Sequence, residues 1–546
     1  MLTKKLKRFC ALGLTVALGM STLVGCGGTG FNTADDEIVF NLQEDPKTID
    51  PQLNTASGAG IVILNAFEGL LRVDEDAKVH PGVAKELPTV SEDGLTYTFK
   101  LRDNAKWSDG QAVTAKDFEY SWLRALDPAT KAEYAYQLFY IENAEAFNQG
   151  KATAEEVGIK AVDDYTLEVK LNAPTTYFDQ LMAFATYQPV RKDIVEAHGE
   201  KWARSPETYV SNGPFRMVEW KDKESIVFEK NPNYWNADAV KLNKLDIRLV
   251  SDETTGYAEY KSGNFDMTNS IHPSEIEAAV AAGDAKVFTE FATYFLCFNV
   301  GNNVEQFSKE AQDALKNPKF RKALSLAIDR QSVVDNIMKG EQVPAHSFTA
   351  PGIKLENGKD FAEKKYMEPT GDLEAAKAML AEAGYPNGEG LPVFNFLINS
   401  EGAHEAVAQY LSDVWSQMGV KVEITKQEFK VFLDTRQNGN YMIGRHGWSG
   451  DYVDPITFLD MWVTGTGNNA AGYSNAEYDN LIKEAKATAD VNKKYELLQK
   501  AEEILMEDMP VIPLYYYTKV RAINPAIQGL IVTSTGKIDF INAYKK

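Results

Sequence analysis

Carboxylates, histidines and a glycine-rich stretch are the residues of this 546-residue chain that could do chemistry, and their spacing matches no catalytic signature. The chain has no GxxxxGK[ST] phosphate loop, no HExxH zinc motif and no GxSxG nucleophile turn. The six histidines lack the helical spacing of metal ligands, and close acids such as Asp451 and Asp454 are expected by chance among 78 acidic residues. The stretch 465–470 follows no clear strand, so we interpret it as a turn. We therefore predict no catalytic residue, no metal site and no cofactor, although a triad is defined by geometry rather than by spacing.

Cys26 has surroundings that predict a covalent modification. A segment with four basic residues precedes the apolar stretch 9–22, which is too short for a spanning helix, and LVGC follows at 23–26. This order resembles the bacterial lipobox. It implies that residues 1–25 are a lipoprotein signal peptide, that Cys26 carries lipid (diacylglycerol, with palmitate as an acyl chain), and that residues 26–37 form a lipidated tether. A plain signal peptide followed by an incidental cysteine is the alternative.

Composition is that of a soluble globular protein, with 44% hydrophobic and 25% charged residues. It excludes a disordered chain, a collagen and a polytopic membrane protein. The formal charge is −21, and it becomes −25 when residues 1–25 with their four basic side chains are removed. Such acidity argues against nucleic acid as a partner, because that affinity depends on Lys and Arg meeting phosphate. Cys297 lies in the apolar run 294–298, so we expect a buried small hydrophobe rather than a disulfide.

Strand and helix patterns alternate along the chain, which predicts a mixed α/β protein of two to four domains. A helix over 373–383 ends at Gly384, and a second one places Val407, Leu411 and Val414 on one face before Gly419. Strands on both sides of this second helix predict a parallel crossover. The expected strands are 37–43, 96–102, 166–171, 225–229, 245–250, 393–399 and 420–424.

Several sequence blocks, kept in one order over about residues 38–540, resemble a single family. It is the peptide/nickel class of extracellular solute-binding proteins (family 5) that feed ABC importers, and the oligopeptide-binding members are the most similar. Any one block is weak, whereas the ordered set is specific. The blocks are FEGLL at 67–71, LRDNAKWSDG at 101–110, VTAKDF at 113–118, SW at 121–122, NGPF at 212–215, NPNYW at 231–235, FRKALSLAIDR at 320–330, AEAGY at 381–385, GW at 447–448, DY at 451–452 and PLYYY at 513–517.

The resemblance implies an α/β fold: a two-lobed clamp like that of periplasmic binding proteins (class II, cluster C) with an additional third domain. Two or three strands would cross between the lobes as a hinge, and the lobes would close over a ligand. The implied division is lobe I from 38–57, 187–290 and 519–546, the extra domain from 58–186, and lobe II from 291–518.

A free peptide offers a cationic amine, an anionic carboxylate and a ladder of amides. Asp451 matches the aspartate that similar proteins place on the peptide amino group; a solvated loop acid is the alternative. Arg445 and Arg436 match positions that reach the peptide carboxylate, for which the guanidinium fork is suited, and salt bridges are the alternative. His404 matches a carboxylate position too, although a core or surface histidine remains open.

A further set is expected to contact the peptide backbone or to form side-chain pockets. Phe429 stands where similar proteins often have Trp, which is a departure from the family pattern. Aromatic side chains are also common in cores, and Glu44 could be an exposed loop acid, so these alternatives stay open. The set is Glu44, Tyr134, Phe429, Gly447, Trp448, Ser449 and Tyr517.

Together these observations predict a monomeric, lipid-anchored receptor for short oligopeptides that performs no chemistry. It would lie on the extracellular face of the bacterial cell membrane, or on the periplasmic side where there is an outer membrane. It would deliver peptides to the transmembrane subunits of an ABC permease. The alternatives are a peptide-pheromone receptor on the same scaffold, then a nickel-chelate or haem-binding branch, a secreted hydrolase with paired carboxylates and a surface adhesin.

Overall fold

The computed structural model describes residues 31–75, 78–175 and 177–546. The predicted signal peptide 1–25, Cys26 and the tether as far as residue 30 lie outside the described residues. Within the described part, no helix is long and apolar enough to span a bilayer. The same part contains no group of three or more His, Cys, Asp or Glu residues arranged to hold a metal ion.

A five-stranded sheet forms one part of the molecule, with strand order β11-β1-β10-β9-β8. The run Glu37–Asn41 is almost wholly buried because β1 is a central strand, parallel to both β10 and β11. Helices α6 (Glu253–Lys261) and α7 (Pro273–Ala282) cover it through Tyr257, Tyr260 and Ile276. The strands are β1 (Glu37–Asn41), β8 (Phe215–Lys221), β9 (Ser225–Lys230), β10 (Lys244–Arg248) and β11 (Met267–Thr268).

A six-stranded sheet forms a second part, with order β13-β17-β12-β16-β14-β15. The predicted crossover is confirmed, since β14 and β15 are parallel and α12 joins them. The strands are β12 (Ala285–Phe298), β13 (Val343–Pro344), β14 (Phe394–Asn399), β15 (Val422–Gln427), β16 (Ile443–Ser449) and β17 (Val511–Ala522). The helices are α8 (Lys309–Lys316), α9 (Pro318–Leu326), α10 (Arg330–Ser332), α11 (Leu373–Glu382), α12 (His404–Ser416), α13 (Phe429–Gln437), α14 (Ile456–Leu459), α15 (Ala476–Lys486) and α16 (Val491–Asp508).

A four-stranded antiparallel sheet, β4-β5-β7-β6, marks the third part. Helix α2 packs against it, and Trp122 of this helix is fully buried and donates from Nε1 to the carbonyl oxygen of Tyr187 over 2.8 Å. The elements are β4 (Thr89–Val90), β5 (Thr96–Lys100), β6 (Ile159–Asp163), β7 (Thr166–Lys170), α2 (Ala115–Leu126), α3 (Ala144–Asn148) and α4 (Phe178–Leu181). Around them lie α1 (Ser57–Ala66), α5 (Lys192–His198) and the pair β2 (Leu71–Val73) and β3 (Val79–Pro81).

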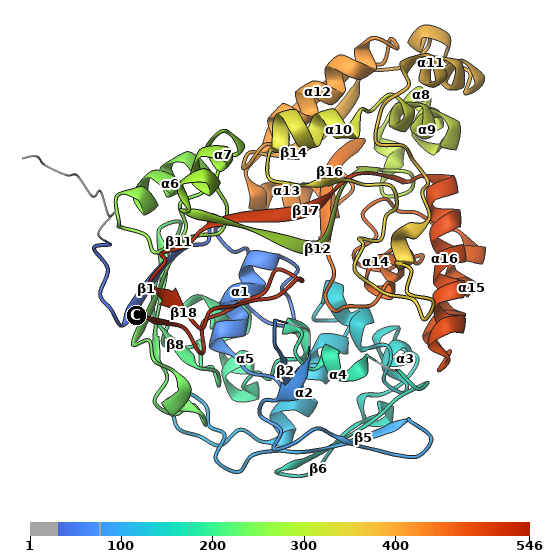
Figure 1. Ribbon diagram of the computed structural model, residues 1–546. Helices are drawn as coiled ribbons and strands as arrows, with labels where there is room; N and C mark the ends of the chain where they lie inside the picture. The colour runs from blue at the N-terminus through green and yellow to red at the C-terminus, as the bar shows by residue number, and fades with distance from the viewer. Residues whose placement is uncertain (1–30, 76–77, 176) are drawn as a thin grey trace, which may run out of the picture.

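Strands β12 and β17 connect the first part with the second, and Figure 1 shows them crossing side by side between the two. They pair antiparallel from Ala285 with Ala522 to Cys297 with Val511. A register shift between Thr289 and Thr293 interrupts the ladder near its middle. A bulge of this kind lets a strand pair bend. The fold is therefore an α/β clamp of two lobes with an extra domain.

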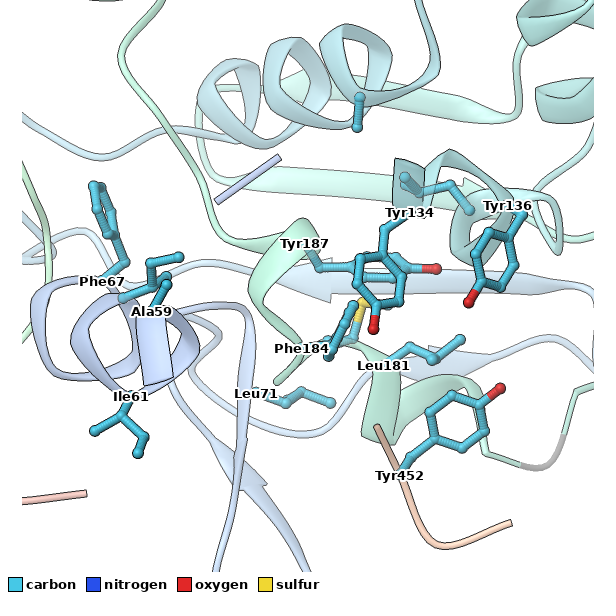
Figure 2. Close-up of a cluster of buried hydrophobic side chains, with 14 of the residues drawn as sticks. Ala59, Ile61, Phe67, Leu71, Tyr134, Tyr136, Leu181, Phe184, Tyr187 and Tyr452 are labelled. Carbon is cyan, nitrogen blue, oxygen red and sulfur yellow. The ribbon is translucent and has the colours of Figure 1, made fainter. Parts of the chain in front are cut away.

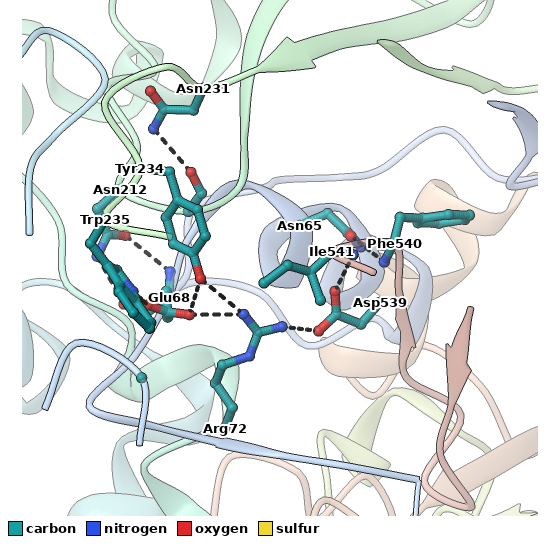
Figure 3. A network of polar contacts seen from close by, with 12 residues as sticks. Asn65, Glu68, Arg72, Asn212, Asn231, Tyr234, Trp235, Asp539, Phe540 and Ile541 are labelled. Carbon is teal, nitrogen blue, oxygen red and sulfur yellow. Dashed lines mark hydrogen bonds and ion pairs between the residues drawn. The ribbon is translucent and has the colours of Figure 1, made fainter. Parts of the chain in front are cut away.

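The C-terminal residues return to the beginning of the chain through two short pairs, β18 (Ile527–Gln528) with β21 (Tyr544–Lys545) and β19 (Ile531–Val532) with β20 (Ile538–Asp539). Figure 3 shows how a polar network fastens β20. Arg72 forms ion pairs with Asp539 and with buried Glu68, and Glu68 also accepts from Tyr234 Oη over 2.6 Å. The network holds the β19–β20 turn against the segment that follows α1.

The local sequence predictions agree with these elements. Strands 96–102, 166–171 and 225–229 correspond to β5, β7 and β9, and helix 373–383 corresponds to α11. Cys297 is fully buried beside the Tyr441 hydroxyl, at 3.3 Å, and burial raises its pKa to about 12. It is the small hydrophobe expected from its sequence context.

Candidate functional site

Two adjoining cavities lie between the lobes, with volumes of about 110 and 320 Å³. They form one cleft because they share lining residues on α1, β16 and the β19–β20 turn. Every residue that the sequence predicts for the peptide site lines one cavity or both. The smaller cavity takes Tyr134, Trp448 and Asp451; the larger takes Glu44, His404, Phe429, Arg436, Arg445 and Tyr517; both take Gly447 and Ser449.

Strand β16 arranges the predicted residues by simple alternation. Arg445, Gly447 and Ser449 are half-buried and line the cleft, whereas His446 is buried between them. Along its whole length β16 pairs with β12, but its pairing with β14 on the other side covers only Ile443 and Gly444. Within the described residues, the stretch that carries the predicted residues thus has one edge free of a strand partner. An extended chain placed there could pair with it.

Asp451 follows β16 by two residues and lies in the smaller cavity. Its carboxylate accepts hydrogen bonds from Gln137 Nε2 at 3.0 Å and from Tyr134 Oη at 3.4 Å. Burial raises the pKa of Asp451 to about 8; nearby Asp460 adds to the rise, while Lys537 and the two hydrogen bonds oppose it. A carboxylate in this environment is poorly compensated and would gain from an ammonium partner.

Lys537 faces the same cavity from the turn between β19 and β20. Burial lowers the pKa of Lys537 to about 8, and Asp451 partly restores it. Its Nζ lies 5.9 Å from the ring centroid of Phe184. The sequence analysis missed this residue, because no local motif indicates that a lysine so far along the chain lies near Asp451.

Aromatic rings enclose the end of the cleft that contains Asp451. The ring of Tyr134 lies 5.0 Å from Phe184, 5.8 Å from Tyr136 and 6.2 Å from Trp448, as centroid distances. Figure 2 shows Tyr134 beside Tyr136, with Phe184 and Leu181 next to each other below Tyr134. Gln137 lies three residues after Tyr134 in a 3₁₀ helix, Glu133–Leu138, where residues three apart share a side. That spacing was the signal by which the sequence could have revealed Gln137.

Arg445 and Arg436 share the opposite end of the cleft. Their guanidinium carbons lie 5.2 and 5.4 Å from the ring centroid of Phe432. Arg445 Nε donates to Asn399 Oδ1 over 2.5 Å. Burial, and then repulsion by Arg445, lowers the pKa of Arg436. Among the described residues neither guanidinium forms an ion pair with a carboxylate, although Glu44 lines the same cavity and Glu133 acts on the pKa of Arg436 from nearby.

His404 begins α12 and stacks on Tyr294, with 5.6 Å between the ring centroids. Burial, reinforced by Arg445 and Lys519, lowers its pKa well below the ordinary value. The imidazole is therefore neutral near pH 7 and acts as a hydrogen-bonding group rather than as a cation.

Glu44 lies in the larger cavity against the first turn of α1, and a methyl group added at Gly58 would overlap its carboxylate. Helix α1 has no side-chain cap of its own at Ala56, so a carboxylate here favours the helix N-terminus. Burial raises the pKa of Glu44 to about 7, and Lys519 opposes the rise. A structural role at α1 is thus as well supported by these contacts as a role in a side-chain pocket.

Tyr517 and Gly447 meet across the sheet. A Cβ placed at Gly447 would lie 2.6 Å from Tyr517 Oη, so this position requires glycine for the tyrosine to approach the strand. Sequence reasoning missed three charged residues nearby. Lys519 lines the larger cavity, and Arg521 and Glu290 form a buried ion pair of 2.9 Å on the crossing strands.

Comparison with known proteins gives a consistent result. The family model "Bacterial extracellular solute-binding proteins, family 5 Middle" matches residues 78–470. The oligopeptide-binding protein OppA of Bacillus subtilis is 38% identical over 540 residues, which is 96% of each chain. The substrate-binding domain of an oligopeptide ABC transporter from Bacillus anthracis superposes with a TM-score of 0.88 at 34% identity, over 94% of this chain and 99% of that one. The pheromone receptor PrgZ superposes with a TM-score of 0.87 at 26% identity, over 94% and 100%.

One relative distinguishes the arrangement of the lobes. The Escherichia coli murein tripeptide-binding protein MppA superposes with a TM-score of 0.84, whereas the unliganded open form of MppA gives 0.62, both at 30% identity and over 94% of this chain. They cover 99% and 98% of the MppA chains. Since identity and coverage are nearly the same, the difference reflects lobe arrangement. The arrangement described here is not that of the open form.

Proposed function

The chain belongs to the bacterial extracellular solute-binding proteins of family 5, and on that premise we propose that it captures short oligopeptides in the cleft between its lobes and delivers them to the permease of an ABC importer. It performs no chemistry on them. The observation that carries this proposal is the separation of charge along one enclosed cleft. At one end the buried carboxylate of Asp451 lies near Lys537. At the other end Arg445 and Arg436 form no ion pair with a carboxylate among the described residues, although Glu44 lines the same cavity.

A zwitterionic peptide complements this separation. Its ammonium group would pair with Asp451, and its carboxylate would pair with Arg445 or Arg436 or accept a hydrogen bond from neutral His404. Between them the peptide backbone would pair with the free edge of β16. Strand rise is about 3.3 Å per residue, so the path from Asp451 to Arg445 corresponds to a peptide of roughly four to six residues.

The remaining predicted residues would contact the backbone or form side-chain pockets: Glu44, Tyr134, Phe429, Gly447, Trp448, Ser449 and Tyr517. We also propose the division into lobe I (38–57, 187–290 and 519–546), the extra domain (58–186) and lobe II (291–518). Bending of β12 and β17 at their register shift would open and close the cleft. Asp451 and Tyr134 would meet only on closure.

Lipid on Cys26 would hold the monomeric protein at the extracellular face of the membrane, beside the transmembrane subunits of its permease. A lipid-anchored receptor keeps its captured ligand near the transporter. Mass spectrometry of the mature protein tests the anchor, because a lipidated Cys26 adds a diacylglycerol mass that a Cys26→Ala variant lacks.

A peptide-pheromone receptor is the second candidate, favoured by the similarity to PrgZ over nearly the whole chain. The cleft chemistry would be the same, and the two roles would differ in ligand selectivity. A receptor for nutrition would accept many sequences, whereas a pheromone receptor would prefer one.

Thermal unfolding of the mature protein without residues 1–26 tests the proposed function. The panel contains di- to octapeptides, their N-acetylated forms, Ni²⁺ with histidine, and haem, after refolding to remove co-purified ligand. A ligand that binds only the folded state raises the midpoint. A rise limited to free-amine peptides is expected. A rise with nickel or haem alone, or with nothing, would contradict the proposal.

A further inference from the structure

Lys537 brings a positive charge to the end of the cleft that contains Asp451, and the contacts proposed for the two peptide termini leave it without a role. It lies on the turn between β19 and β20. We propose that Lys537 selects peptides with an acidic first residue by pairing with the carboxylate of that side chain. The inference rests on the proposed function and adds a substrate preference to it.

The position of Lys537 places it beside the first peptide residue rather than the last. Lys537 and Asp451 line the smaller cavity but not the larger one. Arg445 and Arg436 line the larger cavity but not the smaller one. A peptide whose ammonium group lies on Asp451 therefore begins in the cavity that contains Lys537.

The Lys537 amine has no anion of its own. Among the described residues its Nζ forms neither a hydrogen bond nor an ion pair, and it lies 5.9 Å from the ring centroid of Phe184, at the limit of a cation–π contact. Burial lowers the pKa of Lys537 to about 8 and Asp451 opposes this fall, so most of the amine is still protonated at pH 7. A cation that is shielded from water and lacks a partner is costly, and an anion on the ligand would relieve that cost.

Three further carboxylates near this end of the cleft already pair with cations of the protein. The pairs are Asp460 with Lys486 at 3.1 Å, Glu290 with Arg521 at 2.9 Å, and Asp539 with Arg72. Their charges are thus compensated before a ligand enters. Asp451 is the carboxylate that acts on the pKa of Lys537, and the peptide ammonium group would compete for it.

Binding of a peptide changes the charge balance in the smaller cavity. Once the peptide ammonium group pairs with ionised Asp451, the cavity contains two cations, the ammonium group and Lys537, and one anion. Ile61, Leu64 and Phe184 line the same cavity, and such apolar walls screen charges less than water does. An acidic first side chain would restore the balance, whereas a basic one would bring a third cation.

The space available to a ligand becomes narrow at Lys537. A cavity of about 20 Å³, with room for about one water molecule, shares Lys537 and Gln188 with the smaller cavity. Gln188 Oε1 is buried without a hydrogen-bond partner among the residues that the structure describes. A short acidic side chain would therefore end beside the Lys537 amine, where the Gln188 amide has hydrogen-bonding capacity that the protein itself does not use.

Pentapeptides that differ only in their first residue test the inference. Aspartate, asparagine or lysine precedes Ala-Ser-Ala-Ala, and each peptide is titrated calorimetrically at pH 7 into the ligand-stripped protein. Aspartate and asparagine are nearly isosteric, so the ratio of their Kd values reports the charge. The aspartate peptide should bind about tenfold more tightly than the asparagine peptide, and the lysine peptide about tenfold more weakly.

Two substitutions of Lys537 sharpen the test. Lys537→Met removes the charge and keeps most of the side-chain length, so the aspartate and asparagine peptides should then agree within about twofold. Lys537→Glu reverses the charge, so the lysine peptide should become the tightest of the three. Lys160→Met, on the exposed face of β6 and outside both cavities of the cleft, is the matched control and should keep the wild-type ratio.

Equal affinity of the wild-type protein for the aspartate and asparagine peptides would overturn the role of Lys537 and leave the proposed function intact. A wild-type ratio that persists in Lys537→Met would do the same. Each ratio is taken within one variant, so a general loss of affinity cancels, and the wild-type comparison decides even where a variant fails to fold. Failure of all three peptides to bind wild-type protein would instead overturn the proposed function and this inference with it.

Discussion

The two ends of the cleft differ in charge and in how closely they are enclosed. At the Asp451 end, one carboxylate is enclosed by aromatic rings and accepts hydrogen bonds from Tyr134 and Gln137. At the other end, two guanidinium groups and a neutral imidazole surround a wider space that opens into a further cavity. One end thus offers a single position for a positive charge, and the other offers several positions, one after another along the cleft, for a negative charge.

This difference teaches how a receptor can tolerate length. A site that must accept peptides of several lengths can fix only one terminus. The enclosed end provides the fixed point, because the buried carboxylate of Asp451 needs a positive charge beside it to be ionised. The open end provides more than one cation, so the carboxylate of a peptide of each length would pair with a different one.

Asp451→Asn should produce the largest effect. It leaves the ammonium group of the ligand buried without a counter-charge, at a cost of about 3–5 kcal/mol, or roughly 150- to 4000-fold in Kd. Calorimetric titration with a free-amine pentapeptide measures it. N-acetylated peptide should bind wild type and variant equally weakly. Full affinity in the variant would show that Asp451 does not bind the ammonium group, and the proposed difference between the two ends would be wrong.

Arg445→Ala should weaken binding by about 1.5–3 kcal/mol, and only over a narrow range of peptide lengths. Peptides that place their carboxylate on Arg436 or His404 should lose little. A ladder of three- to eight-residue peptides measured by thermal shift gives the profile. Arg216→Ala, on the exposed face of β8, is the control. A uniform loss at all lengths would assign Arg445 a structural role.

Affinity for free-amine peptides should depend on pH through Asp451. Its pKa of about 8 in the empty site means that it is largely protonated at pH 6 and must lose a proton to bind an ammonium group. Affinity should therefore rise with pH toward 8, by up to about tenfold per unit, and fall once the peptide amine itself deprotonates near 8. Titrations in buffers of different ionisation enthalpy measure the proton release. Asp451→Asn should abolish this dependence, and a flat profile in wild type would contradict it.

The smallest expected effect is a gain in thermal stability of the ligand-free protein. Folding raises the pKa of the Asp451 carboxyl group, so at every pH above its pKa in the unfolded chain this group destabilises the folded protein. The destabilisation becomes smaller as the pH falls from 8 toward 4. Asp451→Asn removes the penalty, so the empty variant should unfold about 1–3 °C higher at pH 8 and show no gain at pH 4. Calorimetry of ligand-free protein checks this. A lower midpoint at pH 8 would show that Asp451 supports the fold.

Local signals made much of the fold predictable. The alternation at 96–102 and the helix end at Gly384 are properties of adjacent residues, and β5 and α11 follow them. The resemblance blocks led to Asp451 and Arg445 because both belong to one short strand and its continuation. Lys537 and Arg521 were missed because each reaches the cleft through the fold of distant segments. The stretch 465–470 was correctly interpreted as a turn, but nothing in it revealed that it walls a cavity.

The network of Arg72, Glu68 and Asp539 has a consequence for limited proteolysis. It fastens the β19–β20 hairpin to the segment that follows α1, and this hairpin supplies one wall of the cleft. A chain cut after β17 would contain both lobes' main sheets yet lack that wall and Lys537. A single cleavage there would therefore disable the cleft while both main sheets stay intact.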